Sequence, residues 1–219
     1  MKKYWAEFLG TYILVFVGCG AIIINSVTDG TVSHLGIGLS FGLVVMTMIY
    51  TIGDISGAHI NPAVTIAFSV AGRLEKKQIL PYVSSQIIGA ILASTTLFLI
   101  FPEADTMGET LPLNNNLMQS FILEAILSFI LMFVILNVST GAKEKGITAA
   151  LAIGGVVAFA AIFAGPISGA SMNPARSIAP ALFSDLSHLW IYIVATTLGA
   201  ILSVFACKLI QKEECCTNC

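Results

Sequence analysis

The sequence has 219 residues, of which 57% are hydrophobic and only 10% are charged, with a formal net charge of −2 and a mean hydropathy of +0.92. Soluble domains carry about 25% charged residues, so this chain has too little polar surface to cover a globule in water. The composition excludes a soluble globular domain, shows no basic patch for nucleic acid, and indicates a bundle surrounded by lipid.

Hydropathy predicts an all-α membrane protein. A spanning helix needs about 20 mostly apolar residues, and six segments qualify: residues 4–26, 34–53, 81–101, 118–138, 146–165 and 189–210. Two shorter apolar stretches, 61–71 and 173–183, each begin with Asn-Pro, and proline suits the first turn of a helix. We interpret them as re-entrant half-helices. Non-helical backbone at membrane depth must be buried in protein or line a water-filled cavity, so the pattern predicts a cavity.

Charge predicts the orientation. With six spans, every Lys and Arg except Arg176 falls at the termini or in the second-to-third and fourth-to-fifth connections. The positive-inside rule then places both termini in the cytoplasm. We expect a multi-pass protein of a prokaryotic inner (plasma) membrane, with His34 and His188 at outer helix ends.

The two halves of the chain repeat. Residues 56–65 and 168–177 share the pattern Ser-Gly-Ala-x-x-Asn-Pro-Ala, and an odd number of spans per half inverts one half relative to the other. Inverted repeats with paired broken helices indicate a site near the bilayer midplane. We expect one channel domain, residues 1–210, with repeats at about 1–101 and 118–210, and a Cys-rich cytoplasmic tail at 211–219.

The duplicated motif consists of Asn61, Pro62 and Ala63 in one half and Asn173, Pro174 and Ala175 in the other. One Asn-Pro could simply start a helix in a loop, but two copies in one frame and in opposite halves predict a pore. Facing helix N-termini present free N–H groups and partial positive charge, which disfavours cations. Asparagine donors there would orient a passing water and interrupt a proton wire.

These motifs resemble the aquaporin (major intrinsic protein) family over nearly the whole chain. The run from Gly165 to Met172 is similar to plant nodulin-like intrinsic proteins and their bacterial relatives. The resemblance implies a right-handed bundle, a homotetramer with one pore per subunit, and passage of water and small neutral solutes such as glycerol or metalloid hydroxides. It also implies an outer selectivity constriction formed by Phe41, Ala161, Ala170 and Arg176. Strict water channels usually have His where this chain has Ala161, so we expect a wider and less polar constriction.

Other polar residues have two interpretations each. Glu7 and Glu124 could relay protons or could accept hydrogen bonds from the re-entrant loops, and their matched positions favour loop support. His59, in the inner vestibule with Ser171 as its counterpart in the second repeat, could gate the pore or only line it. Cys215, Cys216 and Cys219 could bind a soft metal or have no role, and we predict no metal site and no cofactor.

The leading prediction is a passive channel for water and small neutral solutes that excludes ions and protons. One alternative is primarily a glycerol, urea or metalloid facilitator. Another is a structural, non-conducting membrane protein. An enzyme is not predicted, because no nucleophile–base pair, phosphate loop or zinc pattern is visible.

Overall fold

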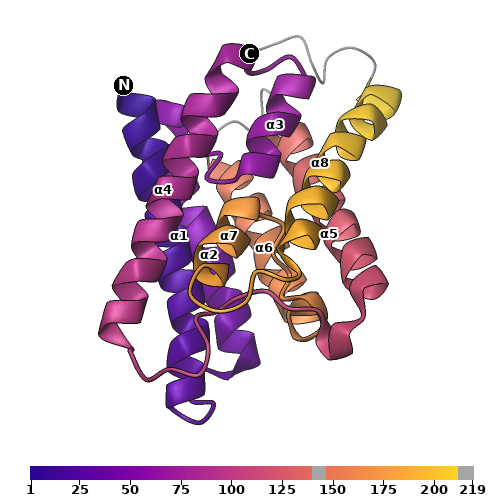
Figure 1. Ribbon diagram of the computed structural model, residues 1–219. Coiled ribbons are helices and arrows are strands. Elements are labelled where there is room, and N and C mark those ends of the chain that lie inside the picture. The colour runs from indigo at the N-terminus through magenta and orange to yellow at the C-terminus, as the bar shows by residue number, and fades with distance from the viewer. Residues whose placement is uncertain (140–146, 212–219) are drawn as a thin grey trace.

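Helices make up most of the computed structural model, which describes residues 1–139 and 147–211 (Figure 1). Six helices are long and apolar enough to cross a membrane. They are α1 (Lys2–Val27), α2 (Ser33–Ser56), α4 (Lys76–Ile100), α5 (Leu117–Val138), α6 (Ile147–Ser168) and α8 (Leu189–Gln211). The two half-helices are α3 (Pro62–Val70) and α7 (Pro174–Ala181), and a single 3-10 turn, η1 (Leu113–Asn115), lies before α5. The predicted all-α fold is confirmed.

Several helix ends differ from the predicted ones. The helix α4 begins at Lys76 rather than at residue 81, so Pro81 lies inside the helix, past its first turn. The helices α2 and α6 run three residues beyond their predicted ends and stop at Gly57 and Gly169, whose φ angles are 86° and 84°. Glycine adopts this left-handed conformation without steric cost, which explains why both helices end there.

Related helix pairs in the two halves pack in the same way. The helix α1 packs against α4, α5 packs against α8, and α2 packs against α6 across the halves. Gly89 on α4 lies against the backbone of Phe8, and Gly199 on α8 lies against the backbone of Ala125. These close approaches need small residues, as is usual where membrane helices cross.

The outer face of the bundle suits a lipid environment. Large apolar side chains such as Leu80, Leu99 and Phe163 are exposed on α4 and α6, where lipid tails would surround them. The start of α1 and the end of α8 lie at the same end of the bundle (Figure 1). An even number of spans requires that arrangement, and it agrees with two termini on one side of the membrane.

Candidate functional site

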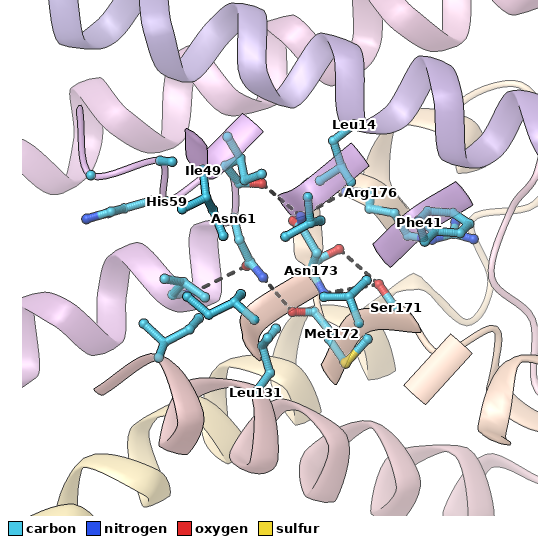
Figure 2. Close-up of a pocket in the computed structure, with 18 of the residues that line it drawn as sticks. Leu14, Phe41, Ile49, His59, Asn61, Leu131, Ser171, Met172, Asn173 and Arg176 are labelled. Atoms are coloured by element: carbon cyan, nitrogen blue, oxygen red, sulfur yellow. Dashed lines mark hydrogen bonds between the residues drawn. The ribbon is translucent and has the colours of Figure 1, made fainter. Parts of the chain in front are cut away.

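A cavity of about 150 Å³ lies inside the bundle between the two half-helices. Figure 2 shows His59 toward one end, Phe41 and Arg176 toward the other, and Asn61 and Asn173 between them. The predicted residues that line it are Phe41, His59, Asn61, Ala161, Ala170, Ser171, Asn173 and Arg176. Most of the remaining lining is aliphatic, from residues such as Val45, Leu131 and Ile153. The structure therefore brings the residues predicted for the constriction and for the centre into one cavity.

Each asparagine of the duplicated motif caps its own half-helix. Asn61 Oδ1 accepts hydrogen bonds from the backbone N–H groups of Ala63 at 2.9 Å and Val64 at 3.4 Å. Asn173 Oδ1 accepts from Ala175 at 3.0 Å and Arg176 at 3.5 Å. Both asparagines have extended backbone conformations, and a proline follows each at the first helical position. The caps fix the amide oxygens toward the helices and leave the amide nitrogens facing away from them.

Each asparagine also donates across the centre to the opposite loop. Asn61 Nδ2 donates to the carbonyl oxygen of Met172 at 2.7 Å, and Asn173 Nδ2 donates to that of Ile60 at 2.8 Å. Ile60 and Met172 have φ angles of 42° and 52°, an uncommon conformation for such residues. An amide nitrogen carries two hydrogens, so each asparagine keeps one for a molecule in the cavity.

Two buried glutamates support the loops. Glu7 accepts hydrogen bonds from Ser56 Oγ at 2.7 Å, His59 N at 2.9 Å, Ile60 N at 2.7 Å and Gln86 Nε2 at 2.7 Å.

Glu124 repeats this pattern in the second half. It accepts from Ser168 Oγ at 2.8 Å, Ser171 N at 2.9 Å and Met172 N at 2.9 Å. Both glutamates are fully buried. Because their oxygens are already occupied by loop donors, this geometry favours loop support over a proton relay.

Phe41 and Arg176 lie together at one end of the cavity (Figure 2), and Ala161 and Ala170, also predicted for the outer constriction, line the same cavity. The guanidinium carbon of Arg176 lies 5.1 Å from the centre of the Phe41 ring, within the range of a cation–π contact. Ala161 and Ala170 contribute only methyl groups, and all four residues are at least nine-tenths buried. The only ion pair in the described residues joins Lys77 and Glu75, so Arg176 has no carboxylate partner there. Its charge remains available to the cavity.

A loop that the sequence did not indicate holds Arg176. Arg176 Nη1 donates to the carbonyl oxygen of Gly108 at 2.6 Å, in the connection between α4 and α5. Thr110 in the same loop donates from Oγ1 to Ser177 Oγ at 2.8 Å. Met107, also in this loop, is buried, with a fractional exposure of 5%. Because the acceptor is a backbone carbonyl, no side chain in the sequence indicates it. The sequence signal that could have indicated it was a longer polar connection containing Gly108.

His59 lies at the end of the cavity opposite Phe41 and Arg176 (Figure 2). Its Nδ1 lies 3.2 Å from Thr65 Oγ1, and its ring stacks on Phe68 with centroids 4.6 Å apart. In the second repeat, Ser171 donates to the carbonyl oxygen of Asn173 at 2.9 Å and contacts Ser177 Oγ. These contacts fix the His59 ring against its neighbours, as expected of a lining residue.

The cysteines predicted as an alternative metal site, Cys215, Cys216 and Cys219, lie outside the described residues. Within residues 1–139 and 147–211, no cluster of His, Cys, Asp and Glu could hold a metal ion.

The chain is similar in sequence and in structure to known proteins. A sequence model described as "Major intrinsic protein" matches residues 1–207. The chain is 46% identical to "Aquaporin NIP1-2" of Arabidopsis thaliana, covering 98% of this chain and 76% of that protein. It is 45% identical to "Aquaporin NIP1-1" of Zea mays, covering 96% and 75%. It superposes on the X-ray structure of the aquaglyceroporin from Plasmodium falciparum with a TM-score of 0.85 and 28% identity, covering 96% of each chain.

Proposed function

Because the chain belongs to the major intrinsic protein family, we propose that it is a passive channel for water and small neutral solutes such as glycerol. The observation that carries this proposal is the pair of capped, cross-bonded asparagines, Asn61 and Asn173, inside an otherwise mostly apolar cavity. Two fixed amide donors in such surroundings favour a small neutral molecule with oxygen lone pairs.

Exclusion of ions and protons follows from the same geometry. The N-termini of α3 and α7 direct partial positive charge toward the centre, which disfavours cations. A water held by both asparagine amides uses its lone pairs on them. It then cannot accept a hydrogen bond from the next water, so proton transfer along the file is interrupted.

The outer constriction supports a broader solute range than water alone. Phe41, Ala161, Ala170 and Arg176 offer one aromatic face, two methyl groups and one guanidinium. The apolar side favours the carbon backbone of a polyol, and the guanidinium donates to its hydroxyl oxygens. Glycerol and neutral metalloid hydroxides share this chemistry, so we propose that both pass. The alternative in which water is incidental to solute transport uses the same residues.

The remaining assignments rest on the family. We infer a homotetramer with one pore per subunit, cytoplasmic termini and no enzymatic activity. The six apolar spans make the chain an integral, multi-pass membrane protein. The prokaryotic inner membrane stays a prediction, because the relatives named above come from plants.

Reconstitution into proteoliposomes tests the proposal. Stopped-flow measurements should give water and glycerol fluxes well above those of empty vesicles, with a proton flux equal to theirs. Ala161→Trp should abolish both fluxes by filling the constriction. Leu151→Trp, on the lipid-exposed face of the same helix, is the matched control and should leave them unchanged. Water flux without glycerol flux would overturn the broad solute range. Absence of both would favour the structural, non-conducting alternative.

A further inference from the structure

The outer end of α6 contains a carbonyl group that the helix itself cannot satisfy in the usual way. Pro166 lies inside α6 and has no N–H group. The carbonyl oxygen of Ile162, four residues earlier, therefore cannot receive the usual helical hydrogen bond. The carbonyl lies at an exposed end of the bundle, so its missing donor can come from solvent or from another part of the protein.

His34 supplies that bond. Its side chain, in the first turn of α2, has Nε2 at 2.6 Å from the carbonyl oxygen of Ile162. A carbonyl only accepts hydrogen bonds, so Nε2 carries the hydrogen. The sequence predicts only that His34 lies at an outer helix end, and this contact could not be predicted from it.

Gly165 makes room for the imidazole ring. A β-carbon at Gly165 would lie 3.3 Å from Cε1 of His34, closer than ordinary van der Waals contact. Gly165 and Pro166 thus combine with His34 as one arrangement: the proline removes a donor, the glycine leaves space, and the histidine replaces the donor.

The contact joins two walls of the outer constriction. Ile162 follows Ala161 directly, and His34 is on the same helix as Phe41. One turn further along α2, a β-carbon at Gly38 would lie 3.2 Å from the backbone nitrogen of Ile162, so α2 and α6 are already in close contact there. The bond from His34 holds the last turns of α6 onto α2 beyond that crossing.

We propose that His34 is a positioning residue for the outer constriction, acting through the Ile162 carbonyl that Pro166 leaves without its helical partner. The consequence for transport rests on the proposed function. The consequence for the stability of α6 does not.

A double-mutant cycle tests the proposal in the full-length reconstituted protein. Its four members are the wild type, His34→Ala, Pro166→Ala and the double variant. Pro166→Ala restores the N–H group within α6, so it should make His34 dispensable. His34→Gln retains a side-chain N–H donor and should rescue much of the loss. His188→Ala is the control, since the side chain of this other outer histidine has no hydrogen bond among the described residues.

Two measurements are made on each variant. Hydrogen–deuterium exchange of residues 160–168 should rise about fivefold in His34→Ala, which corresponds to loss of one hydrogen bond worth about 1 kcal/mol. The glycerol-to-water permeability ratio should rise about twofold or more, because a looser wall admits the larger solute more readily. In the Pro166→Ala background, His34→Ala should change neither quantity appreciably.

Unchanged exchange in His34→Ala, or an equal increase in both backgrounds, would overturn the proposal. A changed exchange with an unchanged permeability ratio would overturn the link to the constriction. If the wild type conducts nothing above empty vesicles, the proposed function fails, and the exchange cycle alone decides whether His34 positions α6.

Discussion

Arg176 is held by the carbonyl oxygen of Gly108, to which its Nη1 donates at 2.6 Å. Gly108 itself lies against α1 with a φ angle of 75°. A β-carbon there would lie 2.8 Å from Cβ and 3.0 Å from Cα of Cys19. The loop between α4 and α5 is therefore seated on α1 by a residue without a side chain, and its backbone in turn orients the guanidinium at the constriction.

Gly108→Ala should move this loop and deprive Arg176 of its acceptor. We expect the glycerol-to-water permeability ratio to rise about twofold or more, since the guanidinium is then free to leave the solute path. Gly30→Ala is a matched control, because Gly30 also has a positive φ, of 91°, but nothing lies within 4 Å of its β-carbon position. Both variants carry backbone strain of about 1–2 kcal/mol. Identical permeability ratios in the two would contradict the role of Gly108.

Arg176→Ala should raise the glycerol-to-water permeability ratio more than Gly108→Ala does. The change removes the only Lys or Arg among the described residues that line the cavity, together with the guanidinium donors for a passing oxygen. Glycerol permeability should rise several-fold relative to water, and a cation leak should appear in a dye-based flux assay. Arg176→Lys keeps the charge but lacks the planar fork, so its ratio should lie between those of the wild type and the alanine variant. A lysine variant that behaves like alanine would mean that geometry matters here and charge does not.

Ala161→His should make the channel more selective for water over glycerol. The imidazole would narrow the cavity and place a polar group where the wild type has a methyl. Glycerol flux should fall to that of empty vesicles while water flux stays within about threefold of the wild type. Paired stopped-flow traces on one preparation measure both fluxes. Retained glycerol flux would show that Ala161 does not set the solute size.

Much of this fold could be predicted from sequence because its signals are local. Apolar runs indicate the spans, and each Asn-Pro pair marks where a half-helix begins. The contact between Asn61 and the Met172 carbonyl could not be predicted, since it depends on how two loops 111 residues apart meet at the centre. The Gly108 acceptor could not be predicted for a related reason. Every residue has a backbone carbonyl oxygen, so the residue type does not indicate which one accepts a hydrogen bond.

The matched glutamates show what repetition in the sequence does predict. Glu7 and Glu124 occupy equivalent places in the two halves, and their bonds to the loops are equivalent as well. The replacement donor for the Ile162 carbonyl illustrates the opposite case. Pro166 predicts that the Ile162 carbonyl lacks its helical hydrogen bond. Only the packing of α2 on α6 identifies His34 as the donor that replaces it.

Glu124→Gln should damage the fold rather than the proton barrier. Glu124 accepts from Ser168, Ser171 and Met172, and glutamine offers one acceptor oxygen in place of two. The amide group would face loop N–H donors, and each buried group left unsatisfied costs about 1–3 kcal/mol. We expect a lower melting temperature in detergent and reduced water flux. Glu103→Gln is the control, because this exposed glutamate in the connection between α4 and α5 has no hydrogen bond among the described residues. Intact folding with altered proton flux would instead support a proton relay.

Gly199→Ala should prevent the second half from packing correctly. A β-carbon at Gly199 would collide with the carbonyl oxygen of Ala125, and it would lie 2.8 Å from the carbonyl carbon and 3.0 Å from Cα of that residue. Backbone atoms cannot swing aside as a flexible side chain would, so α5 and α8 must separate. The separation would also displace Glu124, which precedes Ala125, from the loop that it supports.

Thermal unfolding in detergent measures this effect. Gly199→Ala should lose several degrees of melting temperature or fail to yield folded protein, and Gly89→Ala should behave alike, since its β-carbon would collide with the carbonyl oxygen of Phe8 in the first half. Gly155→Ala on α6 is the control, because nothing lies within 4 Å of its β-carbon position and alanine is the better helix former. Normal folding of Gly199→Ala would mean that α5 and α8 pack less closely than this structure has them, and the equivalence of the two halves would then lose its physical basis.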